Sequence, residues 1–98
     1  MVTRILRLAP GATIEEHHHP FYDETFFVHA GRVSLVLNDE EQLLSSGDVV
    51  YMPSGTIISG EAAGPEEAVL VVVWANVGEK GPLFVYGRPG SSEGPDRQ

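Results

Sequence analysis

The most informative segment of the chain is GATIEEHHHPFYDETFFVHAG, residues 11–31. It holds three consecutive histidines, has acidic residues on both sides of them, and begins and ends with glycine. Side chains alternate along a strand, so His17 and His19 are expected to project to one face and His18 to the other. Two imidazoles at this spacing can bind one metal ion. A turn over HPFYD would bring Glu24 to the same place as a third ligand.

Two histidines and one carboxylate form a ligand set that leaves coordination positions open for water, oxygen or substrate. This set suits Fe, Mn, Ni, Co or Zn as a divalent ion. The alternative is an exposed acidic turn whose histidines are only solvated. Glu15 shares the parity of His17 and is expected either at a solvated mouth or inside the cavity, as a further ligand or a proton acceptor. His18 and His29 are not expected to be ligands.

Short apolar runs separated by glycine and proline continue along the rest of the chain. The expected strands are 3–8, 14–19, 24–30, 32–38, 41–44, 48–52, 56–60, 68–76 and 83–86. Residues 38–41, NDEE, are predicted to form a hairpin turn. No segment shows a sustained helical period, so an all-β sandwich or barrel is predicted. The length predicts one domain over residues 1–86, followed by a flexible tail over 87–98 that is rich in Gly, Pro and Ser.

Composition narrows the classes of partner and compartment. The net charge is −8 and only six residues are Lys or Arg, which disfavours nucleic acids and anionic membranes as partners. Cysteine is absent, which excludes disulfides and thiolate metal sites. No apolar run reaches membrane-spanning length, and the first residues lack the apolar core of a signal peptide. We therefore expect a soluble, cytoplasmic protein.

Residues 11–62 resemble the two sequence motifs of the cupin family. The first motif, G-x5-H-x-H-x4-E-x6-G, is matched at every fixed position by Gly11, His17, His19, Glu24 and Gly31. The second motif, G-x5-P-x-G-x2-H-x3-N, is matched at Gly47, Pro53 and Gly55. The chain then departs from the family pattern, because the histidine position holds Ile58 and the asparagine position holds Ala62.

The resemblance implies a cupin double-stranded β-helix, an antiparallel jelly-roll barrel that often dimerises and carries a metal inside. It implies His17, His19 and Glu24 as metal ligands, with no fourth ligand because Ile58 has no donor atom. Three protein ligands can still hold a catalytic ion. The chain is therefore expected to bind a divalent metal ion in the barrel, and one function open to it is that of a metal-dependent oxygenase or isomerase acting on a small organic molecule. The alternative is a non-catalytic cupin with a degenerate metal site, which binds a small molecule or serves as a dimeric scaffold.

Further residues are candidates for the wall of the pocket. Phe26 shares the parity of Glu24, Ile58 would place an aliphatic wall beside the ion, and Tyr51 at a strand end is a candidate hydrogen-bond donor. Residues 68–76 are apolar on both strand faces, which predicts burial of one face in the barrel and of the other against a second copy in a homodimer. Trp74 in this run would alternatively complete the core of a single chain.

Overall fold

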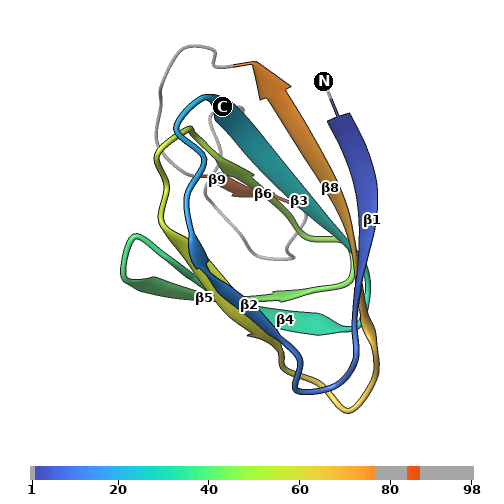
Figure 1. Cartoon of the computed structure of the whole chain (residues 1–98). Helices are drawn as coiled ribbons and strands as arrows, with labels where there is room; N and C mark the ends of the chain where they lie inside the picture. The colour runs from blue at the N-terminus through green and yellow to red at the C-terminus, as the bar shows by residue number, and fades with distance from the viewer. Residues whose placement is uncertain (1, 77–83, 87–98) are drawn as a thin grey trace, which may run out of the picture.

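Within residues 2–76 and 84–86, which the computed structural model describes, the chain forms nine strands and no helix. They are β1 (Val2–Leu8), β2 (Thr13–His17), β3 (Tyr22–Ala30), β4 (Arg32–Leu37), β5 (Glu40–Ser45), β6 (Val49–Met52), β7 (Ile58–Ala62), β8 (Ala68–Asn76) and β9 (Phe84–Tyr86). The antiparallel strands form a five-stranded sheet in the order β1-β8-β3-β6-β9 and a four-stranded sheet in the order β2-β7-β4-β5. Figure 1 shows the two sheets facing each other. The predicted jelly-roll barrel is confirmed.

The hydrophobic core lies between the two sheets, because alternate side chains along each strand point into this space. Along β3, Phe26 is 2% exposed and Val28 is fully buried, whereas Phe27 between them is 37% exposed on the outer surface. On β8, Leu70 and Val72 are buried in the same core. Alternate residues of β4 in the four-stranded sheet belong to the same core, so apolar side chains fill the space between the two sheets, as alternation requires.

The hairpin between β4 and β5 has a two-residue loop of Asn38 and Asp39, with φ angles of 49° and 69°. Both residues adopt the left-handed conformation that a tight hairpin of this twist requires, and asparagine and aspartate tolerate it better than most residues. The Asn38 side chain accepts a hydrogen bond of 2.9 Å from the Ile57 backbone. The predicted NDEE turn is therefore confirmed, and it also fixes the segment that enters β7.

A β-bulge interrupts β2 and changes the direction of its side chains. Ile14 pairs with Gly60 and His17 with Ile58, so three steps along β2 match two steps along β7. The extra residue breaks the alternation, and both Ile14 and His17 are partly buried although their separation is odd. Glu15 is exposed. The expectation that Glu15 points the same way as His17 is therefore not met.

Two further expectations concern membrane-spanning segments and the C-terminal tail. No helix within the described ranges is long and apolar enough to cross a membrane. The predicted tail, residues 87–98, lies outside the described residues.

Candidate metal centre

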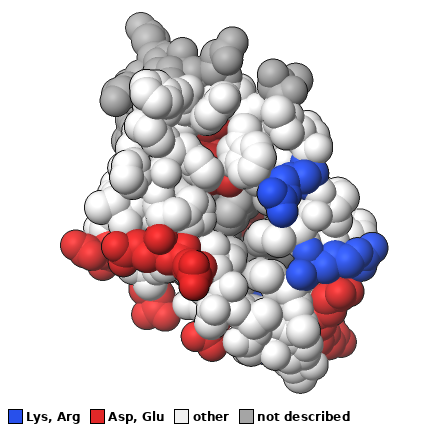
Figure 2. All heavy atoms as spheres, in the orientation of Figure 1, with Lys and Arg blue, Asp and Glu red and all other residues white. Residues whose placement is uncertain are grey.

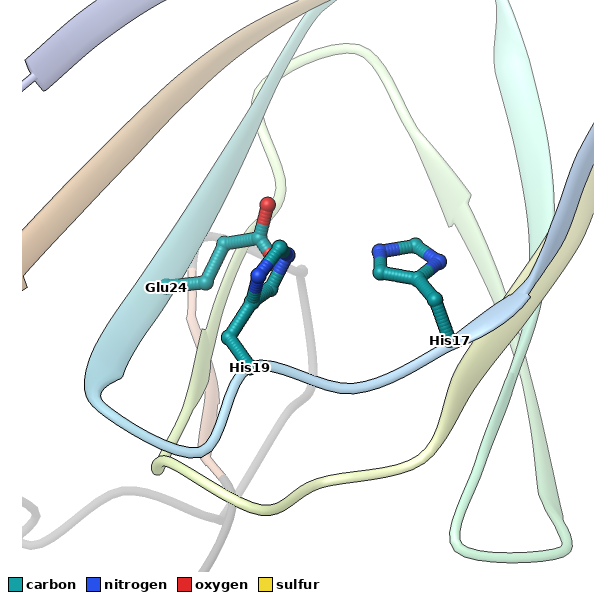
Figure 3. Close-up of side chains that lie close together, drawn as sticks. All are labelled: His17, His19 and Glu24. Atoms are coloured by element: carbon teal, nitrogen blue, oxygen red, sulfur yellow. The ribbon is translucent and has the colours of Figure 1, made fainter.

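The two histidines and the glutamate of the first motif converge between the sheets, as Figure 3 shows. His17 is the last residue of β2, His19 lies in the following loop, and Glu24 lies near the start of β3. One candidate ligand atom from each residue lies within 4.8 Å of the other two. The His19 Nε2 and Glu24 Oε1 atoms are 3.4 Å apart. Adjacent ligands of an ion with bonds near 2.1 Å would be about 3 Å apart, so this pair is close to coordination spacing.

A backbone contact fixes which nitrogen of His17 can bind an ion. Its Nδ1 lies 2.7 Å from the backbone oxygen of Glu15. A carbonyl oxygen only accepts hydrogen bonds, so Nδ1 carries the hydrogen, and in the neutral ring Nε2 keeps its lone pair. A ligating histidine usually donates its second N–H in this way, which fixes the tautomer and the ring orientation. Glu15 thus contributes its main chain to the centre, while its carboxylate lies elsewhere.

Glu24 is only 3% exposed, and one of its oxygens has a partner from β8. Trp74 Nε1–H donates to Glu24 Oε2 over 2.6 Å. The register of β3 and β8 places these two residues directly opposite each other. The hydrogen bond leaves Oε1 as the free oxygen, and this atom is the one that faces His19.

Two buried polar atoms of the centre have no hydrogen-bond partner among the described residues, namely His19 Nε2 and Glu24 Oε1. Leaving such a group unpaired costs about 1–3 kcal/mol. Both atoms are electron donors when His19 is neutral and Glu24 is ionised, and a cation between them would satisfy both. The residues present therefore fit a divalent metal ion.

Burial raises the pKa of Glu24 above its ordinary value of 4.5. The Trp74 hydrogen bond and the nearby charges of His19, His17 and Arg4 act in the opposite direction, but burial outweighs them. A buried carboxylate beside two imidazoles is thus poorly stabilised as an anion by the protein alone. A bound cation would supply the missing stabilisation.

The loop between β6 and β7 holds the His19 backbone in place. Gly55, at a φ of 88°, donates its N–H to the His19 carbonyl over 3.0 Å. The preceding residue, Ser54, donates its backbone N–H to Asp23 Oδ1 over 2.9 Å. Asp23 is 8% exposed and also accepts the hydroxyl of Tyr51 at 2.9 Å. This buried carboxylate therefore anchors the loop that supports the second histidine.

Tyr51 does not join the centre. It lies opposite Thr25 on the outward side of the five-stranded sheet, whereas its neighbour Met52 lies opposite Glu24 and is buried. The prediction that Tyr51 borders the pocket was based on its place at a strand end and did not use the strand pairing. Its hydroxyl instead supports Asp23.

Phe26 and Ile58 are both part of the hydrophobic core, with 2% and 1% exposure. Phe26 follows Glu24 by two residues on the inward face of β3, and Ile58 lies opposite His17 on β7. The structure thus places an aliphatic side chain beside the first histidine. His18 and His29 are exposed.

Sequence reasoning missed two residues of this region, Trp74 as the partner of Glu24 and Arg4 next to Trp74. The Arg4 guanidinium carbon lies 5.5 Å from the centre of the Trp74 ring. Neither residue belongs to the motif, and only the pairing of β1, β8 and β3 brings them to the centre.

Comparison with known proteins agrees with this architecture. The cupin domain family matches residues 4–74. The tetracenomycin polyketide synthase protein TcmJ of Streptomyces glaucescens is 32% identical over 50 residues, which is 51% of this chain and 34% of that protein. A Cupin 2 conserved barrel domain protein from Salinispora arenicola is 30% identical, with a TM-score of 0.66 over 74% of this chain and 60% of that one.

A putative glyoxylate-induced protein from Pseudomonas aeruginosa has the same fold at 18% identity, with a TM-score of 0.78. The match covers 87% of this chain and 34% of that chain. The chain thus spans about a third of the length of this protein and of TcmJ. Because the family match covers most of the sequence and the barrel carries the first motif in place, the chain belongs to the cupin family.

Proposed function

We propose that this cupin binds one divalent metal ion through His17, His19 and Glu24. The observation that carries the proposal is a pair of buried atoms 3.4 Å apart, His19 Nε2 and Glu24 Oε1, neither of which has a hydrogen-bond partner in the described part of the chain. The Nδ1 contact of His17 adds support, since it leaves Nε2 as a lone-pair donor. Neutral imidazoles and one carboxylate suit Fe, Mn, Ni, Co or Zn.

We further propose that the protein is a metal-dependent enzyme, an oxygenase or an isomerase, acting on a small organic molecule. Three protein ligands leave positions open, and an ion bound there supplies Lewis-acid or redox chemistry. This chain contributes the orientation of the ligands through Trp74 and the Glu15 main chain, and an apolar wall through Ile58. That wall favours an apolar part of the substrate beside His17.

A second candidate function is a non-catalytic cupin that binds a small molecule or acts as a scaffold. The observation that favours it is Ile58, which is 1% exposed and stands where the family motif has a histidine. A site that lacks one imidazole binds metal more weakly. The two functions differ in turnover, so oxygen consumption with candidate catechols, diketones or thiols separates oxygenase activity from binding alone.

The metal proposal is tested by elemental analysis of purified protein and by calorimetric titration with Co²⁺ or Mn²⁺. We expect close to one ion per chain, and loss of that ion in the His17→Ala, His19→Ala double variant. The control is His18→Ala, which removes an exposed histidine from the same segment and should keep the ion. Wild-type protein that resists loading at neutral pH would overturn the proposal, as would equal loading of the double variant.

We also propose that the outer face of the five-stranded sheet forms a homodimer. On this face Ile5, Val71, Phe27 and Val49 follow one another across β1, β8, β3 and β6. Ile5 is 53% and Phe27 is 37% exposed, so an apolar row crosses the sheet surface. A second copy offers the same row and covers it symmetrically. Light scattering should show a dimer that Phe27→Glu converts to a monomer; a monomeric wild type at micromolar concentration contradicts this.

A further inference from the structure

A positive charge stands beside the candidate metal centre. Arg4 lies opposite Val72, a core residue, so its side chain leaves β1 on the face of the sheet that looks toward the barrel interior. Its guanidinium carbon is 5.5 Å from the centre of the Trp74 ring. The same indole donates its N–H to Glu24. Arg4, Trp74 and Glu24 are therefore consecutive in space, from the exposed edge of the sheet to the buried carboxylate.

The surface around this edge agrees with such an arrangement. Figure 2 shows a hollow between the sheets, with acidic atoms visible inside it and basic side chains on the side where β1 runs. Arg4 itself is exposed, because β1 is an edge strand. The guanidinium is accessible to a molecule that enters between the sheets.

Arg4 differs from the neighbouring arginine on the same strand in its partners. Arg7 lies opposite Val69 and pairs with Glu67 at 3.2 Å. The ion pairs found in the described part of the chain give Arg4 no carboxylate, and its charge acts on Glu24 only at a distance. The chain has 14 acidic and six basic residues. An exposed arginine with no carboxylate partner among the described residues, beside a centre suited to a cation, is available to pair with an anion that enters the site.

We infer that the molecule bound by this centre carries a carboxylate, which pairs with Arg4 while a neighbouring oxygen of the same molecule reaches the metal ion. The inference rests on the proposed metal site and names the class of its ligand. A divalent ion exceeds the charge of Glu24 by one unit, and Arg4 adds a second, so the centre favours an anion over a neutral molecule. The planar guanidinium matches a carboxylate with two parallel hydrogen bonds, and the Trp74 ring limits its movement.

The test compares two probes of nearly equal size, glycolate and glycolamide, which differ in the charge of the carboxyl end. Each is titrated into Co²⁺-loaded protein, and binding is followed by calorimetry and by the visible absorption of the cobalt ion. The variant is Arg4→Met, which keeps an unbranched apolar stem over Trp74. The matched control is Arg7→Met, which makes the same change in net charge three residues along the strand.

We expect wild type to bind glycolate more tightly than glycolamide. Arg4→Met should weaken glycolate binding about fivefold or more, as loss of a charge-assisted pair does, and leave glycolamide binding unchanged. Arg7→Met should affect neither probe. Equal glycolate affinity in Arg4→Met and wild type, or an equal loss in Arg7→Met, would overturn the inference while leaving the metal proposal intact. Failure of the wild type to take up Co²⁺ is a separate result and overturns both.

Discussion

Replacing Glu24 by glutamine separates the cost of the buried carboxylate from its use as a metal ligand. The amide keeps the size of the side chain, and its oxygen can still accept the Trp74 N–H bond. In metal-free protein near pH 7 the substitution removes a charge whose ionisation burial opposes. Each unit by which burial raises the Glu24 pKa makes the ionised form about 1.4 kcal/mol less stable in the folded protein. The metal-free variant should therefore be more stable than wild type.

The size of this effect is large enough to measure. For a domain of this length, about 1 kcal/mol shifts the thermal midpoint by about 4–8 °C. A ligand present at about 100 times its dissociation constant stabilises the folded state by about 2.7 kcal/mol. Wild type should gain this amount from Co²⁺, whereas Glu24→Gln should gain little because it lacks the anionic ligand. The order of the two midpoints should therefore reverse between EDTA and Co²⁺.

Thermal unfolding followed by circular dichroism in both conditions measures this reversal. His18→Gln serves as the control, since it changes an exposed side chain in the same loop and should behave like wild type in both. The reasoning is refuted if Glu24→Gln is less stable than wild type in EDTA and is still stabilised by Co²⁺ to the same extent.

Three other perturbations have defined outcomes. Because burial raises the Glu24 pKa from 4.5, the protonated carboxyl contributes fully to the stability of metal-free protein below pH 4.5, and this contribution is lost as the pH rises through the folded-state pKa. Urea unfolding across this range should show the free energy of unfolding of wild type falling relative to that of Glu24→Gln. A gap between the two proteins that shrinks with rising pH contradicts this. Ile58→His supplies a donor opposite His17 and should raise Co²⁺ affinity about tenfold or more, as measured by competition with a chelator. The lost apolar packing should lower the free energy of unfolding of the metal-free protein by about 2 kcal/mol, as measured by urea unfolding. Tyr51→Phe removes the hydroxyl that donates a hydrogen bond to Asp23 and should cost about 1 kcal/mol without changing the metal content. Loss of the ion would show instead that the centre depends on the support that Tyr51 gives to Asp23.

The convergence of His17, His19 and Glu24 could be predicted from the sequence because the three residues lie close together along the chain, across one turn. The expected strand 14–19 is nevertheless too long, since β2 ends at His17 and His19 lies in the loop that follows. Most strands could also be predicted from the sequence, since glycine and proline mark their ends and runs of β-branched residues fill them. Both features depend on neighbours in sequence. They need no knowledge of which strands pair.

What the sequence did not reveal depends on pairing between distant segments. Alternation predicts the same strand face for Glu15 and His17, at a solvated mouth or inside the cavity, but the bulge opposite β7 breaks this parity. Glu15 is exposed, and its carbonyl oxygen contacts His17. The prediction that Tyr51 lies near the pocket could not use its pairing with Thr25, which shows that the Tyr51 side chain faces outward. Trp74 contacts Glu24 across 50 residues of sequence, so only the order of β3 and β8 reveals it.

The most direct test of the metal centre is a crystal structure of protein loaded with Co²⁺, with anomalous diffraction recorded at the cobalt edge. We predict one anomalous peak between His17 Nε2, His19 Nε2 and Glu24 Oε1, at about 2.0–2.2 Å from each. A map with no peak there, or with cobalt bound only at His18 or His29 on the surface, would contradict the account.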